Sequence, residues 1–381
     1  MLTRDDALEL DAADLLAGWR DEFVIPDNSL VYLDGNSLGM MPRRTLARLE
    51  SVMRDEWAGG LIRSWEHWVD MPQRVGDRLA PLIGALPGEV AVHDSTTVNL
   101  YQLVDAACAL HPDRGVIAIS PSEFPTDRYV VDGVGRARGM RVSDDFDDLD
   151  DVAVVVRSVV DYRTAEVVDV TGETARTKAA GAIALWDLSH AAGVLVVDLA
   201  WAGVELAVGC TYKYLNGGPG APAFSYVARS LQSTLAQPIW GWFAQADQFD
   251  MGPTFMPQPD IRRVLLGTPS ILALAAVDEG IAVTVEAGIE AIQSKARALT
   301  GFALELCDQF TLESSTTRDA TRRGGHVAVQ HRHARRLVAE LADRGVITDF
   351  RDPDIVRIGC SPLTTRFSDV FDGLTQLANL G

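Results

Sequence analysis

The feature that most constrains the fold is a series of short apolar runs between residues 90 and 230. These runs are rich in β-branched residues and alternate with segments of helical character. Strands buried on both faces have nearly continuous apolar sequences, and parallel strands need a crossover between them. The pattern therefore predicts an α/β fold with a mostly parallel, seven-stranded sheet. The strand candidates are residues 89–94, 115–120, 151–160, 181–189, 193–200, 204–212 and 222–228.

A second, smaller unit follows the predicted sheet. Residues 271–309 carry apolar side chains at spacings of three and four, which predicts one long helix between two lobes. From about residue 325 the pattern is strand, helix and strand. A chain of 381 residues is long enough for two packed lobes. We predict a large domain over residues 47–275. An N-terminal arm and a smaller α+β domain would occupy residues 1–46 and 276–381.

The charge balance excludes several classes of partner. The chain carries 53 acidic and 34 basic side chains, a formal net charge of −19. Such a surface repels nucleic acid and anionic membranes, and no apolar run is long enough to span a bilayer. The four cysteines are scattered without a metal-binding spacing. The acidic N-terminus lacks a signal-like pattern. We expect a cytoplasmic protein that binds a small molecule and no structural metal.

Lysine is rare in this chain, and its positions are informative. Only Lys178, Lys213 and Lys295 occur, whereas arginine supplies the other basic residues. A lysine is needed where an amine must lose its proton and attack an aldehyde, which a guanidinium cannot do. Lys213 follows an apolar run and precedes a Gly/Pro-rich stretch, in GCTYKYLNGGPGAPAF (209–224). It is either a nucleophilic amine in a cleft or an exposed residue of a hairpin.

Polar residues at the ends of other runs could complete such a site. Asp187 closes an apolar run, so its carboxylate would lie at the carboxyl end of a strand, where ligands bind in parallel sheets. A carboxylate there could keep the ring nitrogen of pyridoxal phosphate (PLP) protonated, or it could cap a helix. Thr96 and Thr97 open a helical segment and could bind a phosphate. A plain helix cap explains them equally well.

Two further positions have both a functional and a structural interpretation. Phe124 could stack on a flat ring with Asp127 beside it, although a proline turn into a helix explains the same residues. Arg357 lies in mid-strand between apolar residues, and a buried guanidinium needs an anionic partner. That partner could be a substrate carboxylate or an internal aspartate. His190 alone is more often structural than catalytic. Neither a dinucleotide-binding nor a P-loop glycine motif is present.

Taken in order, these motifs resemble the kynureninase family, which belongs to the fold-type I PLP-dependent enzymes (the aspartate aminotransferase superfamily). The resemblance extends from about residue 30 to 375. The matching stretches are YLDGNSLG, LIRSW, STTVNLY, FPTD, YRT, WDLSHAAG, YKYLNGGPG, GWF, GTPSIL, RGGHV and RIGCSPLTTRFSDV. YKYLN, WDLSHA and FPTD in this order are highly specific.

The resemblance implies a role for each matched residue. Lys213 would hold PLP and move protons, Asp187 would pair with the pyridine nitrogen, and Tyr212 would shuttle a proton. Arg357 would bind the α-carboxylate of the substrate, and Asn36 would also contact the substrate. The cofactor site would comprise Thr96, Thr97, Phe124, Asp127, Ser158, Asp187, His190, Tyr212, Lys213, Trp242 and Thr268. Trp242 and Thr268 would come from the neighbouring subunit of a homodimer.

The family implies hydrolysis of the Cβ–Cγ bond of L-kynurenine, or of a ring-substituted kynurenine, to an anthranilate and L-alanine. It also implies a place in tryptophan catabolism or NAD biosynthesis. A PLP enzyme of this family with another amino-acid substrate or reaction, such as another carbon–carbon lyase or an aminotransferase, is the alternative. A non-catalytic homologue is a third hypothesis, which the presence of Lys213, Asp187 and Arg357 disfavours.

Three stretches depart from the family pattern. Where the family has HVNYRTG, this chain has VVDYRTA (159–165), so a histidine and a glycine are replaced and the asparagine becomes Asp161. After GWF the usual GHxxPF is AQADQF (244–249), and the segment after LIRSW is about two residues shorter. We expect these stretches to face the substrate ring or to shape the loops around it.

Overall fold

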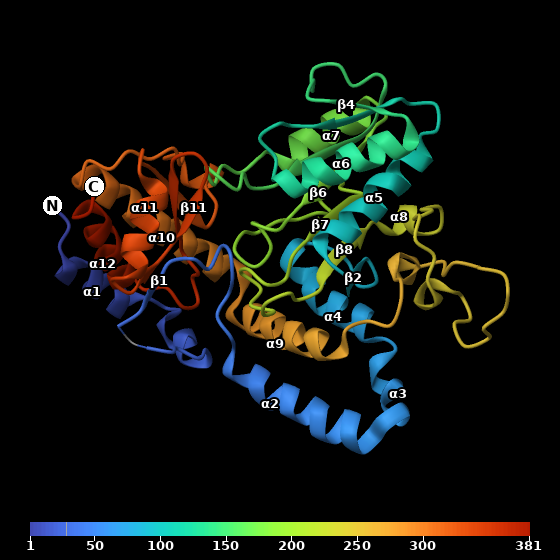
Figure 1. Cartoon of the computed structure of the whole chain (residues 1–381), viewed down its shortest axis with the longest axis horizontal. Coiled ribbons are helices and arrows are strands. Elements are labelled where there is room, and N and C mark those ends of the chain that lie inside the picture. Colours follow the sequence, from blue (N-terminus) through green and yellow to red (C-terminus); the bar gives the residue numbers. More distant parts are fainter. Residues whose placement is uncertain (28) are drawn as a thin grey trace.

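The computed structural model describes residues 1–27 and 29–381 and has two lobes (Figure 1). The larger lobe is built around a seven-stranded sheet, and the smaller lobe contains both chain termini. Helix α9 (Ile271–Ala287) lies beneath the larger lobe in the view of Figure 1, above the helix labelled α2 (Arg43–Ser51). Among the described helices, none is both long and apolar enough to cross a membrane.

The large sheet is mostly parallel, as predicted. Strand β8 is antiparallel to both of its neighbours, and all the other pairs are parallel. Since crossover helices return the chain in one direction, the parallel strands present their carboxyl ends at a common edge. In spatial order the strands are β2 (Val90–His93), β8 (Ala223–Val227), β7 (Leu206–Gly209), β6 (Ile183–Asp187), β5 (Val152–Ser158), β3 (Val116–Ile119) and β4 (Arg141–Ser143).

Helices cover both faces of this sheet, which explains why its strands are continuously apolar. Alternate residues of β6 point to opposite sides: Leu185 packs with one helical layer and Trp186 with the other. The first layer contains α5 (Thr96–Leu110) and α6 (Pro125–Arg138). The second contains α4 (Met71–Leu79), α7 (Val170–Ala179) and α9. The shorter α8 (Arg229–Gln232) follows β8, and α2 (Arg43–Ser51) and α3 (Trp65–Trp68) precede α4.

The smaller lobe has its own core around a three-stranded antiparallel sheet. In this sheet β12 (Ile355–Gly359) lies between β11 (Asp349–Arg351) and β9 (His326–Gln330). A two-stranded parallel sheet joins β1 (Val31–Tyr32) to β10 (Val346–Ile347). The helices of this lobe are α1 (Arg4–Ala13), α10 (Ile289–Gln309), α11 (Ala334–Ala342) and α12 (Phe367–Ala378).

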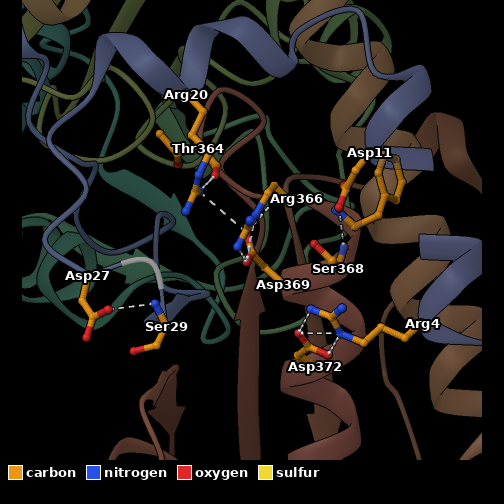
Figure 2. A network of polar contacts seen from close by, with 11 residues as sticks. Arg4, Asp11, Arg20, Asp27, Ser29, Thr364, Arg366, Ser368, Asp369 and Asp372 are labelled. Carbon is orange, nitrogen blue, oxygen red and sulfur yellow. Dashed lines mark hydrogen bonds and ion pairs between the residues drawn. The ribbon is translucent and has the colours of Figure 1, made fainter. Parts of the chain in front are cut away.

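The N-terminal segment is fastened to α12 by polar contacts (Figure 2). Asp11 accepts hydrogen bonds from the backbone amides of Phe367 at 2.6 Å and Ser368 at 3.2 Å, so it satisfies free donors at the start of α12. Arg4 pairs with Asp372, the Nε–Oδ1 distance being 2.8 Å. These contacts agree with grouping the N-terminal arm and the C-terminal lobe. The domain boundaries at residues 46/47 and 275/276 stay a prediction.

The elements differ from prediction in several places, among them strands β10 and β11 of the smaller lobe, which were not predicted. Residues 193–200 were predicted as a strand but form turns, in which the amides of Val194 and Leu195 both bond to the Ala191 carbonyl. The single helix predicted over 271–309 is two helices, because Gly288 adopts a φ of +83° between α9 and α10. Strand β4 was not predicted, since it has three residues at the sheet edge.

Candidate active site

A cleft at the carboxyl ends of the parallel strands brings together residues from five segments. The start of α5 contributes two threonines, the start of α6 contributes Phe124 and Asp127, and strands β5, β6 and β7 contribute residues at or beyond their ends. The cleft is lined by Thr96, Thr97, Phe124, Thr126, Asp127, Ser158, Tyr162, Asp187, Ser189, His190, Tyr212 and Lys213. Nine of the eleven residues predicted for the cofactor site therefore lie in one cavity.

The amine of Lys213 has one close polar neighbour in this cleft. Its Nζ lies 2.9 Å from His190 Nε2 and 5.9 Å from the centre of the Tyr212 ring. Burial, followed by the positive charge of Lys213, holds the pKa of His190 well below its usual range. The imidazole is therefore neutral at physiological pH, and it can accept a hydrogen bond from the lysine.

Asp127 and Asp187 are buried in the wall of the cleft, and the half-buried Glu123 lies near them. Asp187 lies at the end of β6, and its Oδ1 accepts the Ser189 amide at 2.7 Å. Burial and then the neighbouring carboxylates of Asp187 and Glu123 raise the pKa of Asp127 well above its usual range. Glu123 accepts the Ser158 amide at 3.0 Å, and burial raises its pKa also. One or more of these acids is thus protonated at neutral pH.

These residues fit PLP. Thr96 and Thr97 lie in the first turn of α5, where free backbone amides can bind a phosphate. Asp187 offers a carboxylate at the neighbouring strand end for a protonated ring nitrogen. The buried Asp127 Oδ2 and His190 Nδ1 have no hydrogen-bond partner among the described residues, as expected of polar groups arranged around a ligand. Phe124 packs edge-on against Tyr162 with ring centres 5.3 Å apart.

Trp242 and Thr268 lie outside this cleft within one chain. Trp242 belongs to an aromatic cluster with Trp65, Phe243 and Phe249, at centroid distances between 4.6 and 6.0 Å. Thr268 is exposed and lines a separate hollow beside His93 and Asp94, near the start of α5. The family resemblance implies that both residues belong to the site of a neighbouring subunit, so their contribution to the cofactor site stays a prediction.

Arg357 is fully buried on β12, and its partner is an internal aspartate. The guanidinium forms a two-pronged pair with Asp349, with an Nε–Oδ1 distance of 2.7 Å. It also donates to the Tyr162 carbonyl at 2.7 Å and to Ser37 Oγ at 3.0 Å. The sequence allowed either a substrate carboxylate or an internal aspartate as the partner of Arg357, and the structure shows the aspartate. The Tyr162 contact places Arg357 beside the cleft, because Tyr162 lines it.

Asn36 belongs to the same group of contacts. With its amide oriented so that the oxygen faces the guanidinium, Asn36 accepts from Arg357 Nη2 at 3.0 Å and Nε at 3.1 Å. The loop that carries Asn36 also meets the lysine segment, because the Gly39 amide donates to the Tyr212 carbonyl at 2.8 Å. A side chain at Gly39 would overlap the Lys213 carbonyl, so glycine permits this contact.

The stretches that depart from the family pattern shape the cleft indirectly. Val159 is buried in the core and does not line the cleft. Asp161 accepts the amides of Arg163 and Thr164 and so fixes the turn that carries Tyr162. In the 244–249 stretch, Gln245 Oε1 accepts the Met256 amide at 2.7 Å and closes its own loop. In the short segment after LIRSW, Trp68 donates to Glu56 at 2.6 Å.

Comparisons with solved structures agree on the fold. The apo cysteine desulfurase of Thermococcus onnurineus NA1 superposes with a TM-score of 0.84 at 17% identity, covering 95% of this chain and 97% of the other. A C-DES variant with glycine covalently linked to its PLP cofactor gives a TM-score of 0.82 at 16% identity, covering 95% and 99%. The fold and the site together define a fold-type I PLP-dependent enzyme.

Sequence comparisons identify the family within this class. A family model described as the kynureninase C-terminal domain matches residues 292–377. The kynureninase of Pseudomonas fluorescens is 42% identical over 399 aligned positions, which cover all of this chain and 96% of the relative. A kynureninase of Burkholderia pseudomallei is 43% identical with the same coverage. The chain belongs to the kynureninase family, and its cofactor is PLP.

Proposed function

We propose that this protein hydrolyses the Cβ–Cγ bond of L-kynurenine, or of a ring-substituted kynurenine, to an anthranilate and L-alanine. The observation that carries the proposal is that Lys213, Asp187 and Tyr212 line one cleft, with the buried Arg357 beside it. The chain that contains this cleft is 42–43% identical to kynureninases over its whole length. PLP, when bound through Lys213, supplies an electron sink for the cleavage.

The side chains around Lys213 suit proton transfer at the substrate. Lys213 Nζ takes the proton from the substrate Cα, and the neutral His190 at 2.9 Å accepts a hydrogen bond from that amine. Cys210, burial and the carboxylates of Asp187 and Asp127 raise the pKa of Tyr212 above its usual range. Its phenol therefore stays protonated and can give a proton to the alanine carbon after water has added to the γ-carbonyl and the Cβ–Cγ bond has broken.

Asp187, the threonines and Arg357 position the reactants. Asp187 would pair with the ring nitrogen of PLP, and Thr96 and Thr97 would hold its phosphate at the start of α5. Arg357 would hold the substrate α-carboxylate through its planar N–H groups, as arginine does in charge-assisted pairs. Ser158 and Phe124 would complete the walls around the ring.

We infer that the active enzyme is a cytoplasmic homodimer. Thr268 and Trp242 lie outside their own chain's cleft, and the family pattern assigns both to the cofactor site. The loop between them exposes large apolar side chains, namely Phe249, Met251 and Met256, each 60% exposed or more. Exposed apolar patches of this kind mark protein interfaces. A second copy would cover them and bring Thr268 to the neighbouring cofactor.

A direct assay tests the function. The protein is loaded with PLP and incubated with L-kynurenine or 3-hydroxykynurenine, and the product is followed by anthranilate fluorescence and alanine analysis. We expect an anthranilate and alanine in equal amounts. Absence of product from both substrates, in a protein that retains the absorption band of bound PLP, would refute the proposed reaction.

A further inference from the structure

Arg357 belongs to a group of charged side chains whose net charge can be balanced by only one further anion. On β11, Asp349 pairs with Arg357 and also with Arg351, whose Nη2 lies 2.8 Å from Asp349 Oδ2. Ser37 donates to the same carboxylate at 2.7 Å. Two cations and one anion give this Arg351–Asp349–Arg357 group a net charge of +1. That single surplus charge is what an incoming carboxylate would neutralise.

A second acid, Asp34, lies near this group, and the charges of Arg357 and Arg351 act on it. Asp34 lies on the chain beside β12, in a parallel bridge with Gly359, and its backbone carbonyl accepts the Ser37 amide at 3.0 Å. Its Oδ1 is buried and has no hydrogen-bond partner among residues 1–27 and 29–381. A carboxylate is costly to bury without partners. When Asp34 is ionised, the group as a whole is neutral.

We propose that Asp34 and a bound carboxylate are alternative counter-ions of the Arg351–Asp349–Arg357 group, so that Asp34 takes up one proton when a carboxylate binds Arg357. Ionised Asp34 and a ligand carboxylate would together place three anions against two cations in a poorly solvated site. Protonation of Asp34 removes the excess negative charge. The proposal rests on the proposed binding of the substrate carboxylate at Arg357.

Among Asp34 and the three members of the Arg351–Asp349–Arg357 group, Asp34 is the one whose ionisation state changes near neutral pH. Burial, and then Asp349, raises the pKa of Asp34 to about 6, against the opposing pull of Ser37, Arg357 and Arg351. Burial opposes ionisation of Asp349 as well, but Arg357 and Arg351 outweigh it, so the pKa of Asp349 lies below its usual range. Arginine side chains carry their charge throughout the physiological pH range. At pH 6 to 8 Asp349 stays ionised, whereas Asp34 titrates.

The aromatic and imidazole groups nearby do not titrate in this range. Burial raises the pKa of Tyr32 to about 12 and that of Tyr214 further still, so both phenols stay neutral. His326 lies on the strand beside Arg357, and its burial lowers its pKa to about 3. His190, whose ring centre is 5.8 Å from that of His326, is neutral for the same reason. A proton taken up near pH 7 is thus assigned to Asp34.

The test measures binding of a carboxylate that lacks an amine. The probe is 4-oxo-4-phenylbutanoate, which resembles the substrate but cannot displace Lys213, and its uncharged amide is the matched control ligand. Calorimetry gives the dissociation constant for the PLP-loaded protein between pH 6 and 7.5. We expect binding of the acid to weaken by about tenfold over this interval, since binding is linked to protonation of Asp34, and binding of the amide to stay constant.

Substitutions assign the proton to its site. Asp34→Asn mimics the protonated acid, so its dissociation constant should not change with pH and should be about 30-fold lower than that of the unaltered protein at pH 7.5. Asp352→Asn is the control, because the Asp352 side chain, although it follows Arg351 in the chain, is 81% exposed and pairs with Arg335. It should keep the pH dependence. The proposal would be overturned if the dissociation constant of the acid did not change with pH in the unaltered protein, or if it still changed with pH in the Asp34→Asn variant.

Two further measurements keep the test decisive. If Asp34→Asn does not fold, proton uptake by the unaltered protein is measured at pH 7.5 in buffers of different ionisation enthalpy. Close to one proton per bound probe is expected, and no uptake would refute the proposal. Turnover of kynurenine is assayed separately. Proton-linked probe binding without turnover would count against the proposed reaction but support the role of Asp34.

Discussion

The two basic residues of the candidate active site, Lys213 and Arg357, are surrounded very differently. Lys213 makes one close side-chain contact, to His190, in a cleft whose buried Asp127 and His190 atoms have no partners in the part of the chain that the structure describes. Arg357 donates to Asp349, Ser37 and Tyr162 and has no exposed surface. The cofactor region is thus arranged for a group that must be added. In the region around Arg357, the proposed carboxylate region, the guanidinium is already paired, so a carboxylate that bound there would compete with the protein's own side chains.

The largest expected effect concerns the cofactor region. Lys213→Ala should lower kcat by at least about a thousandfold, because no other amine lines the cleft to hold PLP and move the Cα proton. The absorption band of lysine-bound PLP should vanish as well. Lys178→Ala is the control, since Lys178 is 44% exposed and pairs with Glu205. Turnover that survives in Lys213→Ala would remove this residue from the mechanism.

A substitution in the carboxylate region should separate binding from cofactor attachment. Arg357→Lys keeps a positive charge but loses the planar fork that contacts Asp349 and a carboxylate. We expect KM for kynurenine to rise by about 30-fold or more, while the PLP absorption band is unchanged. Arg335→Lys, on the exposed face of α11, should change neither. Loss of PLP from Arg357→Lys would show that the two regions are not independent.

The buried acid Asp127 of the cofactor region should lower the free energy of unfolding as the pH rises. The pKa of Asp127 is raised in the folded state, so between the ordinary carboxyl pKa of about 4 and neutral pH the folded protein holds a proton that the unfolded chain releases. Stability therefore falls with rising pH, by up to about 1.4 kcal/mol per unit for one such group. Asp127→Asn should make this decline shallower.

Urea unfolding of the PLP-free protein at pH 5.5 and 7 measures this effect. Asp132→Asn alters an exposed acid of the same helix. It should leave the pH dependence of the free energy of unfolding as it is in the unaltered protein. An Asp127→Asn variant with an unchanged slope would mean that Asp127 is ionised in the folded protein. The raised pKa would then not apply.

The smallest effect concerns the turn that joins the two regions. Ala165 adopts a φ of +65° at a position where the family usually has glycine. An L-residue with a side chain is strained there, so Ala165→Gly should raise the free energy of unfolding by about 0.5–1 kcal/mol. Ala180→Gly is the control, because Ala180 has a φ of −80° and should lose stability instead. Destabilisation by Ala165→Gly would argue against the strain.

The sequence predicted the cofactor region better than the carboxylate region. Lys213, Asp187 and Thr96 each follow a continuous apolar strand, and strand ends of a parallel sheet meet at one edge, so their meeting could be expected. Glu123 and Ser189 were missed, because an acid before a proline turn and a serine after a strand carry no distinctive signal. Asp349 was missed because its pairing with Arg357 depends on the strand register of the small sheet.

Some elements could not be predicted from the local pattern of apolar residues. Residues 193–200 are as apolar as the true strands, but their backbone groups bond within turns and, at Leu199, to the Ile83 carbonyl. Tertiary packing decides such a case, not hydrophobicity. The break at Gly288 divides a stretch whose apolar spacing is continuous on both sides. Single-residue backbone geometry of this kind is not encoded in the hydrophobic period.

One measurement tests the central claim most directly. The PLP-loaded protein is incubated with L-kynurenine in water enriched in oxygen-18, and the products are analysed by mass spectrometry. Hydrolysis at Cγ predicts one labelled oxygen in the carboxylate of anthranilate and equal amounts of anthranilate and unlabelled alanine. Unlabelled anthranilate, or alanine formed without it, would contradict hydrolytic cleavage by this site.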